Sequence, residues 1–251
     1  MNEKNIKLTI EYNGTNYSGW QSQKNGNTIQ DIIVDGILKT TNQKINLIAA
    51  GRTDAGVHAL GQVANFKIDH KLESEKYKDA LNYYLPKDIR ILQSNEVDIE
   101  FHARFNAKSK RYRYLIGLDR SALYFNQRWE LERELDFNLL QQSADLIVGE
   151  HDFAPFCVVS SLKDDNRCII ESSKWYRVGR LLIYEIRGNR FLHSMIRSLV
   201  GGMTNLAQIN PDKNKLNLTL EKFGDIINSQ TDERLLFTAP ACGLYLRSVQ
   251  Y

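Results

Sequence analysis

Apolar and polar positions along the first hundred residues follow patterns typical of short strands and helices. Residues 6–12 alternate between the two kinds, which predicts a strand with one buried face. Asn27 and Thr28 can cap a helix, because apolar residues recur at helical spacing from Ile29 to Ile37. The other elements predicted here are strands at 45–50 and 62–68, a helix at 73–84 and a strand at 89–93. The predicted order is β-α-β-β-α-β.

The second half repeats this order. It begins with an alternating strand at residues 111–118 and ends with the run GLYLRSVQY. Between them the pattern predicts a helix at 136–148, strands at 168–178 and 181–187, and helices at 190–206 and 218–228. Two copies of a split βαβ plan therefore stand in tandem. We expect an α+β protein of two ferredoxin-like or RRM-like halves, residues 1–102 and 103–251, each with an antiparallel or mixed sheet and helices on one face.

The composition is that of an ordinary globular chain. Of its 251 residues 42% are hydrophobic, enough to bury a core, and 33 basic against 30 acidic residues leave a net charge of +3. No apolar run reaches the roughly 18 residues of a membrane span, and the first residues lack the apolar core of a secretion signal. We therefore expect a cytoplasmic protein without membrane contact. Its three cysteines include no CxxC pair, so we expect reduced thiols.

Charge is segregated although its sum is small. Five basic and no acidic residues lie between Arg104 and Tyr114, whereas residues 130–152 hold seven acids and one base. The run KRYRY interleaves basic and aromatic side chains, which suits phosphate contacts with bases stacked between them, so Lys110 and Arg111 are candidates for nucleic-acid binding. For one such cluster, a solvated strand edge protected by charge is an equally good interpretation. A second basic cluster, with six basic residues against the single Glu185 between Lys174 and Arg197, favours nucleic acid and a central basic cleft.

That second cluster includes the helix predicted to begin at Arg190. Arg190, His193 and Arg197 recur at i, i+3 and i+7, so they would share one face while apolar residues take the other. All three are therefore candidates for contacts with nucleic acid. On helix geometry alone, a surface salt-bridge network is the slightly better interpretation.

The segment GRTDAGVH, residues 51–58, is the densest polar cluster between two predicted strands. Val57 and His58 stand where a P-loop would have Lys and Ser or Thr, which leaves a nucleotide site of that kind without support. Asp54 has no second acid at the spacing of a glycosidase pair or a metal cage. An Asp between glycines is usually a turn residue, but Arg52 and His58 beside it are costly to place there for structure alone. If the loop is catalytic, its chemistry is that of one carboxylate. The histidines lack metal-binding spacing, so no metal is expected.

Five motifs make the sequence similar to the TruA family of tRNA pseudouridine synthases over almost the whole chain. They are YSGWQSQ followed by TIQ, GRTDAGVHALGQV, FHARFNAKSKRYRY, FLHSMIRSLVGG and APACGLYL. The resemblance implies that Asp54 is the catalytic aspartate, that Arg52 helps displace the target base and that Arg197 pairs with Asp54. It also implies that Tyr112 contacts the uracil and that Leu244 lines the pocket.

The same resemblance implies isomerisation of uridine to pseudouridine at positions 38 to 40 of the tRNA anticodon stem-loop. It further implies a homodimer whose two clefts share the RNA, and no metal or organic cofactor. Arg190, His193, Lys110 and Arg111 would then bind the substrate. The run HDFAPFC departs from the family, whose members more often carry small hydroxyl residues in its middle, and this departure concerns RNA contacts at the rim rather than chemistry.

Two rival functions are weighed against this one. A non-catalytic RNA-binding protein of two RRM-like halves would leave Asp54 without a task, and neither half shows a full aromatic run on its central strands. A metal-dependent nuclease is the weaker rival, and activity in chelator would exclude it. The sequence leaves open whether Asp54 attacks the sugar, attacks the uracil ring or takes a proton from C2′.

Overall fold

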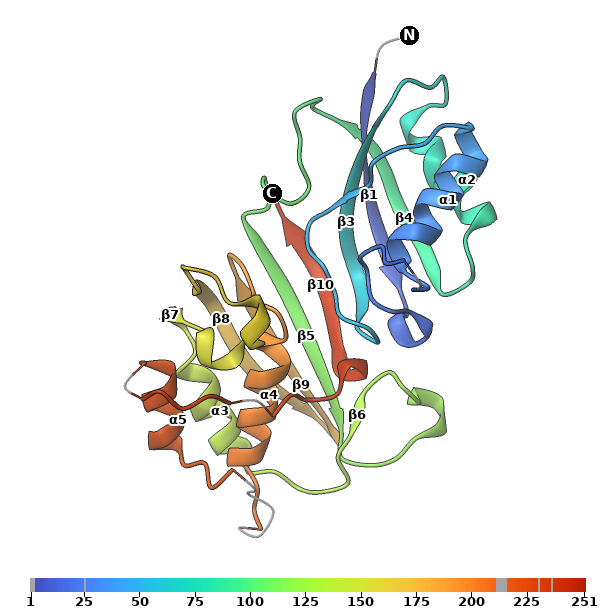
Figure 1. Ribbon diagram of the computed structural model, residues 1–251. Helices are drawn as coiled ribbons and strands as arrows, with labels where there is room; N and C mark the ends of the chain where they lie inside the picture. The colour runs from blue at the N-terminus through green and yellow to red at the C-terminus, as the bar shows by residue number, and fades with distance from the viewer. Residues whose placement is uncertain (1–2, 25, 211–215, 230, 236) are drawn as a thin grey trace. The chain divides into compact units, whose positions relative to one another are not determined.

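The computed structural model describes residues 3–24, 26–210, 216–229, 231–235 and 237–251 (Figure 1). The chain divides into two compact units. The first unit comprises Met1–Lys110 and Tyr245–Tyr251, and the second comprises Arg111–Leu244. The functional division at residues 102 and 103 stays a prediction.

The first unit is built on a mixed sheet. Its strands are β1 (Lys4–Tyr12), β3 (His58–Ile68), β4 (Ile89–Val97) and, from Tyr245 onward, β10 (Leu244–Gln250), in the order β4-β1-β3-β10. β1 pairs antiparallel with β4 and β3, and β10 pairs parallel with β3. The two-residue strand β2 (Ile48–Ala49) pairs antiparallel with β3. The alternation that predicted β1 also sets its burial, because Ile6, Leu8 and Ile10 are fully buried.

Two helices, α1 (Ile29–Thr41) and α2 (Tyr77–Tyr84), cover one face of this sheet (Figure 1). Thr28 caps α1 as predicted, because its hydroxyl accepts a hydrogen bond from the Asp31 backbone N–H. Gly36 of α1 faces the side chains of Leu81 and Leu85, at the end of α2. The helices thereby close the core on which the loops at the strand ends are mounted.

The second unit is also α+β with a mixed sheet. The strands β5 (Ser109–Gly117), β9 (Leu181–Gly188), β8 (Arg167–Val178) and β7 (Gly149–Asp152) are neighbours in that order. β8 is antiparallel to β9 and β7, whereas the short β6 (Trp129–Glu130) is parallel to β5. The helices are α3 (Phe137–Asp145), α4 (Met195–Leu206) and α5 (Leu220–Ile227), and α3 packs against α4, α5 and β8. Short 3-10 turns occur at Gly14–Asn16, Ser74–Lys76, Ala122–Tyr124, Ala154–Phe156, Val159–Ser161 and Ala241–Gly243.

The predicted strands and helices all occur, but several bounds differ and β6 and β7 were not predicted. The strand expected at 45–50 is reduced to Ile48–Ala49. The helix expected from Arg190 begins only at Met195, so the prediction that Arg190, His193 and Arg197 share one helix face is wrong. The physical reason is Ser194, whose φ of +60° is left-handed and therefore cannot lie inside a right-handed helix.

Helix length bears on membrane contact. The longest helix of the described ranges, α1, has 13 residues, about 20 Å at 1.5 Å per residue, against the roughly 30 Å of a bilayer core. No helix in the described parts of the chain could cross a membrane.

Candidate active site

The loop that carries Asp54 connects β2 to β3 and is held through the residue before it. Thr53 is buried, and its hydroxyl lies 2.7 Å from the hydroxyl oxygen of Tyr12. Burial raises the pKa of Tyr12 to about 12, so this hydroxyl keeps its proton at neutral pH. The Thr53 carbonyl accepts the backbone N–H of Trp20 at 3.1 Å, and the Asp54 carbonyl accepts that of Val57 at 3.2 Å. The backbone on both sides of the Asp54 side chain is therefore fixed.

The segment around Gly19 forms the other wall of this loop. Gly19 has a φ of +91°, and a Cβ placed on it would lie 2.7 Å from the Thr53 carbonyl oxygen. Only glycine combines this dihedral angle with so close an approach. The Nε of Arg52 donates to the side-chain oxygen of Gln21 at 2.9 Å, and Gln21 in turn donates to Gln30 at 2.8 Å. The motifs YSGWQSQ and GRTDAGVH are thus joined by direct contacts, between residues more than thirty positions apart in the sequence.

His58, at the start of β3, has contacts that are part of the packed interior of the first unit. It is buried, its Nδ1 accepts the Gly14 backbone N–H at 3.0 Å, and its ring stacks on Tyr245 with centroids 4.6 Å apart. Because Nδ1 accepts, the hydrogen of the neutral ring is on Nε2. Within the described ranges, no three His, Cys, Asp or Glu side chains are grouped as a metal site needs.

Lys110 lies beside the beginning of the same loop. Its Nζ is 3.3 Å from the position that a Cβ on Gly51 would take. Burial, together with repulsion from the Arg104 guanidinium, lowers the pKa of Lys110. The Gly51 carbonyl is held by the amide of Gln62 at 2.8 Å. The first unit therefore holds a positive charge next to the Asp54 loop.

Tyr112 lies on the inward side of β5. It is buried, as Tyr114 is, and its ring meets Phe191 edge-on with centroids 5.1 Å apart. Strand alternation puts Arg111 and Arg113 on the opposite side, where Arg113 pairs with Glu185 at 2.7 Å. The tyrosines and the arginines of KRYRY therefore lie on opposite sides of β5, and the nucleic-acid contacts of Lys110 and Arg111 stay a prediction.

Arg197, on α4, is tied to the segment that precedes β10. Its Nε donates to the Ala239 carbonyl at 2.8 Å, and the Ala239 N–H donates to the Arg197 carbonyl at 3.0 Å. The Tyr114 hydroxyl donates to the Pro240 carbonyl at 2.7 Å, and burial holds the pKa of Tyr114 well above its ordinary value. Leu244 follows on this segment and is buried. The motifs FLHSMIRSLVGG and APACGLYL therefore meet in the second unit.

Arg190 and His193 are bound to a different part of the second unit. Arg190 donates to the Asp165 carbonyl at 2.7 Å, and the Nδ1 of His193 lies 2.8 Å from the Ser161 hydroxyl. Both contacts are in the segment between β7 and β8. Their role as RNA ligands stays a prediction, as do the pairing of Asp54 with Arg197 and the roles given to Tyr112 and Leu244.

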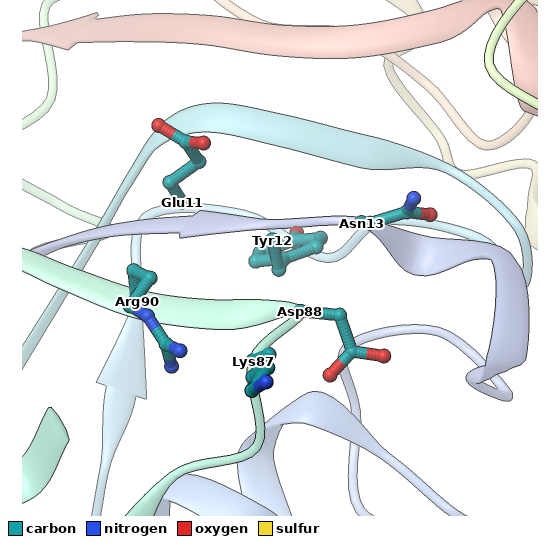
Figure 2. Close-up of a pocket in the computed structure, with 6 residues that line it drawn as sticks. All are labelled: Glu11, Tyr12, Asn13, Lys87, Asp88 and Arg90. Carbon is teal, nitrogen blue, oxygen red and sulfur yellow. The ribbon is translucent and has the colours of Figure 1, made fainter. Parts of the chain in front are cut away.

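A separate pocket of about 310 Å³ lies where β1 ends and β4 begins (Figure 2). It is lined by Glu11, Tyr12, Asn13, Lys87, Asp88 and Arg90. Asp88 accepts the Tyr17 hydroxyl through its carboxylate and the Asn13 N–H through its carbonyl, and Arg90 donates to two nearby carbonyls. In Figure 2 the Asp88 carboxylate and Asn13 lie at one end of the pocket and Arg90 toward the other. These groups join the two strand ends, and the lining includes none of the predicted site residues.

Sequence reasoning named Asp54 and Arg52 but not the residues that hold them. Tyr12, Trp20 and Gln21 contact the loop from positions about thirty to forty residues earlier in the chain. The one available signal is the glycine of YSGWQSQ, which suggests a close approach of the backbone without saying to what.

Comparison with known proteins gives one family. A family model described as tRNA pseudouridine synthase matches residues 8–106 and 144–251. Several proteins named tRNA pseudouridine synthase A are similar over their whole length and 99% of this chain. They include those of Acetivibrio thermocellus, at 44% identity, Caldicellulosiruptor saccharolyticus, at 40%, and Thermoanaerobacter sp. strain X514, at 38%.

Proposed function

The chain belongs to the tRNA pseudouridine synthase family and is a tRNA pseudouridine synthase, an isomerase; from this premise we propose which uridines it converts and how. The substrate is the anticodon stem-loop of tRNA, at positions 38 to 40. The single catalytic carboxylate is Asp54. The observation that carries this assignment is the fixed loop, in which Thr53 and Val57 hold the backbone on either side of a partly exposed Asp54.

The reaction breaks the bond from ribose C1′ to uracil N1 and forms one from C1′ to C5. The C5 proton is lost and N1 gains a proton, so the composition of the RNA does not change. No oxidation or external group is involved. The uracil must leave its stack to react, which costs a few kcal/mol. The enzyme must therefore hold a detached base and present one ionised carboxylate to it.

Asp54 reacts as the carboxylate, whether it attacks a carbon or takes a proton. A carboxylate buried beneath RNA needs a counter-charge, and we assign that contact to the guanidinium of Arg197. Arg52, beside Asp54 and anchored by Gln21, displaces the target base. Tyr112 stacks on the uracil and Leu244 lines the pocket. Their burial supports contacts with the ring face of a base rather than with bulk solvent.

Lys110, Arg111, Arg190 and His193 bind the tRNA backbone in this proposal. We further propose that the two units are tandem ferredoxin-like halves around a basic cleft and that the enzyme is a homodimer. The strand orders support the tandem repeat, since β1-β3-β2 in the first unit corresponds to β5-β9-β8 in the second.

The carboxylate assignment is tested with Asp54→Asn. We expect release of tritium from C5-labelled uridines of tRNA to fall by at least about 10²-fold, since the amide is neither nucleophile nor base. Affinity for the same tRNA should persist. Asp79→Asn, an exposed acid-to-amide change on α2, is the matched control and should release tritium at the unmodified rate.

Three results would contradict the proposal. Undiminished release by Asp54→Asn would remove the carboxylate from the chemistry. Binding of tRNA without release by the unmodified protein would leave an RNA-binding module. Mapping of pseudouridines outside positions 38 to 40 would show that the substrate site is elsewhere.

A further inference from the structure

The turn from His102 to Asn106 presents an aromatic ring to solvent. The Phe105 side chain is 76% exposed. The His102 ring lies against it, with centroids 4.3 Å apart and planes at 31°, and the Arg104 guanidinium carbon is 5.7 Å from its centroid. An exposed phenylalanine by itself is ordinary, so its surroundings decide what it means.

The turn is fixed by its own hydrogen bonds. The His102 N–H donates to the Asn106 side chain at 2.7 Å, and the Asn106 N–H donates to the His102 carbonyl at 3.0 Å. The Nδ1 of His102 accepts the backbone N–H groups of Arg104 and Phe105 at 3.2 and 3.3 Å. The ring is therefore held outward by a closed network, so little conformational entropy is lost when something binds to it.

The turn is also anchored to the sheet through Ala103. This residue is fully buried, its N–H donates to Asn65 at 2.8 Å, and its carbonyl accepts the Tyr251 hydroxyl at 2.8 Å. Ala103 packs in one cluster with Ala50 and Val63, and Ala50 is the residue before the loop of Asp54. The turn and the catalytic loop are therefore mounted on the same part of the first unit.

The charge around the ring suits an anion. Residues 101–118 contain no acidic side chain. Arg104 is close enough to Lys110 for the two charges to repel each other, and Lys110 lies against Gly51 at the start of the catalytic loop. Two cations close enough to repel each other are an arrangement that an anionic phosphate between them would relieve.

We propose that Phe105, backed by His102, is a stacking platform for an unpaired base of the tRNA outside the reaction pocket, and that Arg104 binds the adjacent phosphate. A flat ring beside a guanidinium recognises a nucleotide by its π face and its charge, whatever the base. The platform would position the stem-loop for several target uridines without reading their sequence. The identity of the RNA rests on the proposed function, whereas the platform itself rests on the turn.

The platform is tested by binding of a fluorescent anticodon stem-loop to the Asp54→Asn protein, which does not turn over. Phe105→Ala should weaken binding about 5- to 150-fold, the range for loss of one stacked base. Phe105→Tyr keeps the ring and should bind within about twofold of the parent. Tyr83→Ala, which removes a ring that is 82% exposed on α2, is the matched control and should change nothing.

Two further measurements separate stacking from other roles. In the active protein, Phe105→Ala should raise KM for tRNA by a similar factor and leave kcat within about twofold, since the contact is the same before and during the reaction. Arg104→Gln should lower the slope of log affinity against log salt by about 0.7 to 0.9, the loss of one phosphate contact.

The outcomes also separate this proposal from the proposed function. Pseudouridine formation with unchanged affinity in Phe105→Ala would overturn the platform and leave the enzyme. Phe105→Leu that binds as well as Phe105→Tyr would overturn stacking in favour of a plain apolar contact. If the protein lacked synthase activity but bound RNA in a Phe105-dependent way, the platform would stand and the proposed function would fail.

Discussion

Gly19 shows how closely the backbone of the Asp54 loop depends on a single residue. Its Cα lies so near the Thr53 carbonyl that a side chain would displace the backbone one residue before Asp54. Displacements of about 1 Å near reacting groups can cost roughly 10²-fold in rate. At this scale, the position of Asp54 depends on contacts that neighbouring residues such as Gly19 and Thr53 make with each other.

We therefore predict that Gly19→Ala destabilises the fold by about 1–2 kcal/mol through its left-handed φ and lowers turnover more than tenfold. Gly179→Ala is the matched control, because Gly179 also has a positive φ, +59°, but nothing lies within 4 Å of its added Cβ. It should show the cost in stability without the loss of turnover. Thermal unfolding and tritium release measure the two effects, and equal turnover in both variants would contradict the role of the close approach.

At the scale of elements, packing decides where helices can take larger residues. Gly36 is buried on α1, and a Cβ there would lie 3.5 Å from the nearest Leu85 carbon, an ordinary contact. Gly201 is also buried in a helix, α4, but a Cβ there would lie 2.1 Å from the Phe237 carbonyl oxygen. The two glycines look alike in sequence and differ only in what faces them.

We predict that Gly36→Ala stabilises the protein by about 0.5–1 kcal/mol, since alanine favours the helix and fits the space. Gly201→Ala should destabilise it, because the Phe237 backbone must move. Denaturant unfolding with unchanged m-values measures both changes. A loss of stability in Gly36→Ala would mean that the interface between α1 and α2 cannot accept even a methyl group.

At the scale of the whole molecule, the proposed chemistry needs groups from both units. Asp54, Arg52 and Lys110 belong to the first, and Tyr112 and Arg197 to the second. The chain enters the second unit within β5 and leaves it within β10, so each of these strands contributes to both units. In this proposal one repeat alone cannot be the enzyme, because each repeat holds only some of the side chains that the reaction needs.

The proposed pairing of Asp54 with Arg197 predicts an energetic coupling between the units. In a double-mutant cycle with Asp54→Asn and Arg197→Gln, the free energies of unfolding should depart from additivity by at least about 0.5 kcal/mol if the side chains are in contact. Asp54→Asn with Arg177→Gln is the control cycle, because Arg177 pairs with Glu134. Additivity within about 0.3 kcal/mol in both cycles would contradict the ion pair.

The sequence by itself determined most of the helices and strands, though not all of their bounds, and the family. Alternation of period two placed β1 and β5, and helical periodicity with a Thr28 cap placed α1, because these signals are local in the chain. Five motifs, with runs of up to fourteen residues, sufficed for the family, since the reaction needs particular side chains at particular positions. The site residues assigned on that basis stay predictions.

Only the tertiary structure decided which of the assigned site residues lie near one another and which segments hold them. It moved Arg190 and His193 off α4, because Ser194 takes a left-handed conformation. It also joined Trp20 to Thr53 and Ala103 to Ala50, contacts between segments that no local pattern relates. Periodicity depends only on residues that are neighbours in the sequence. The position of a carboxylate such as that of Asp54 depends instead on contacts with segments that are distant in the sequence and meet only in the folded chain.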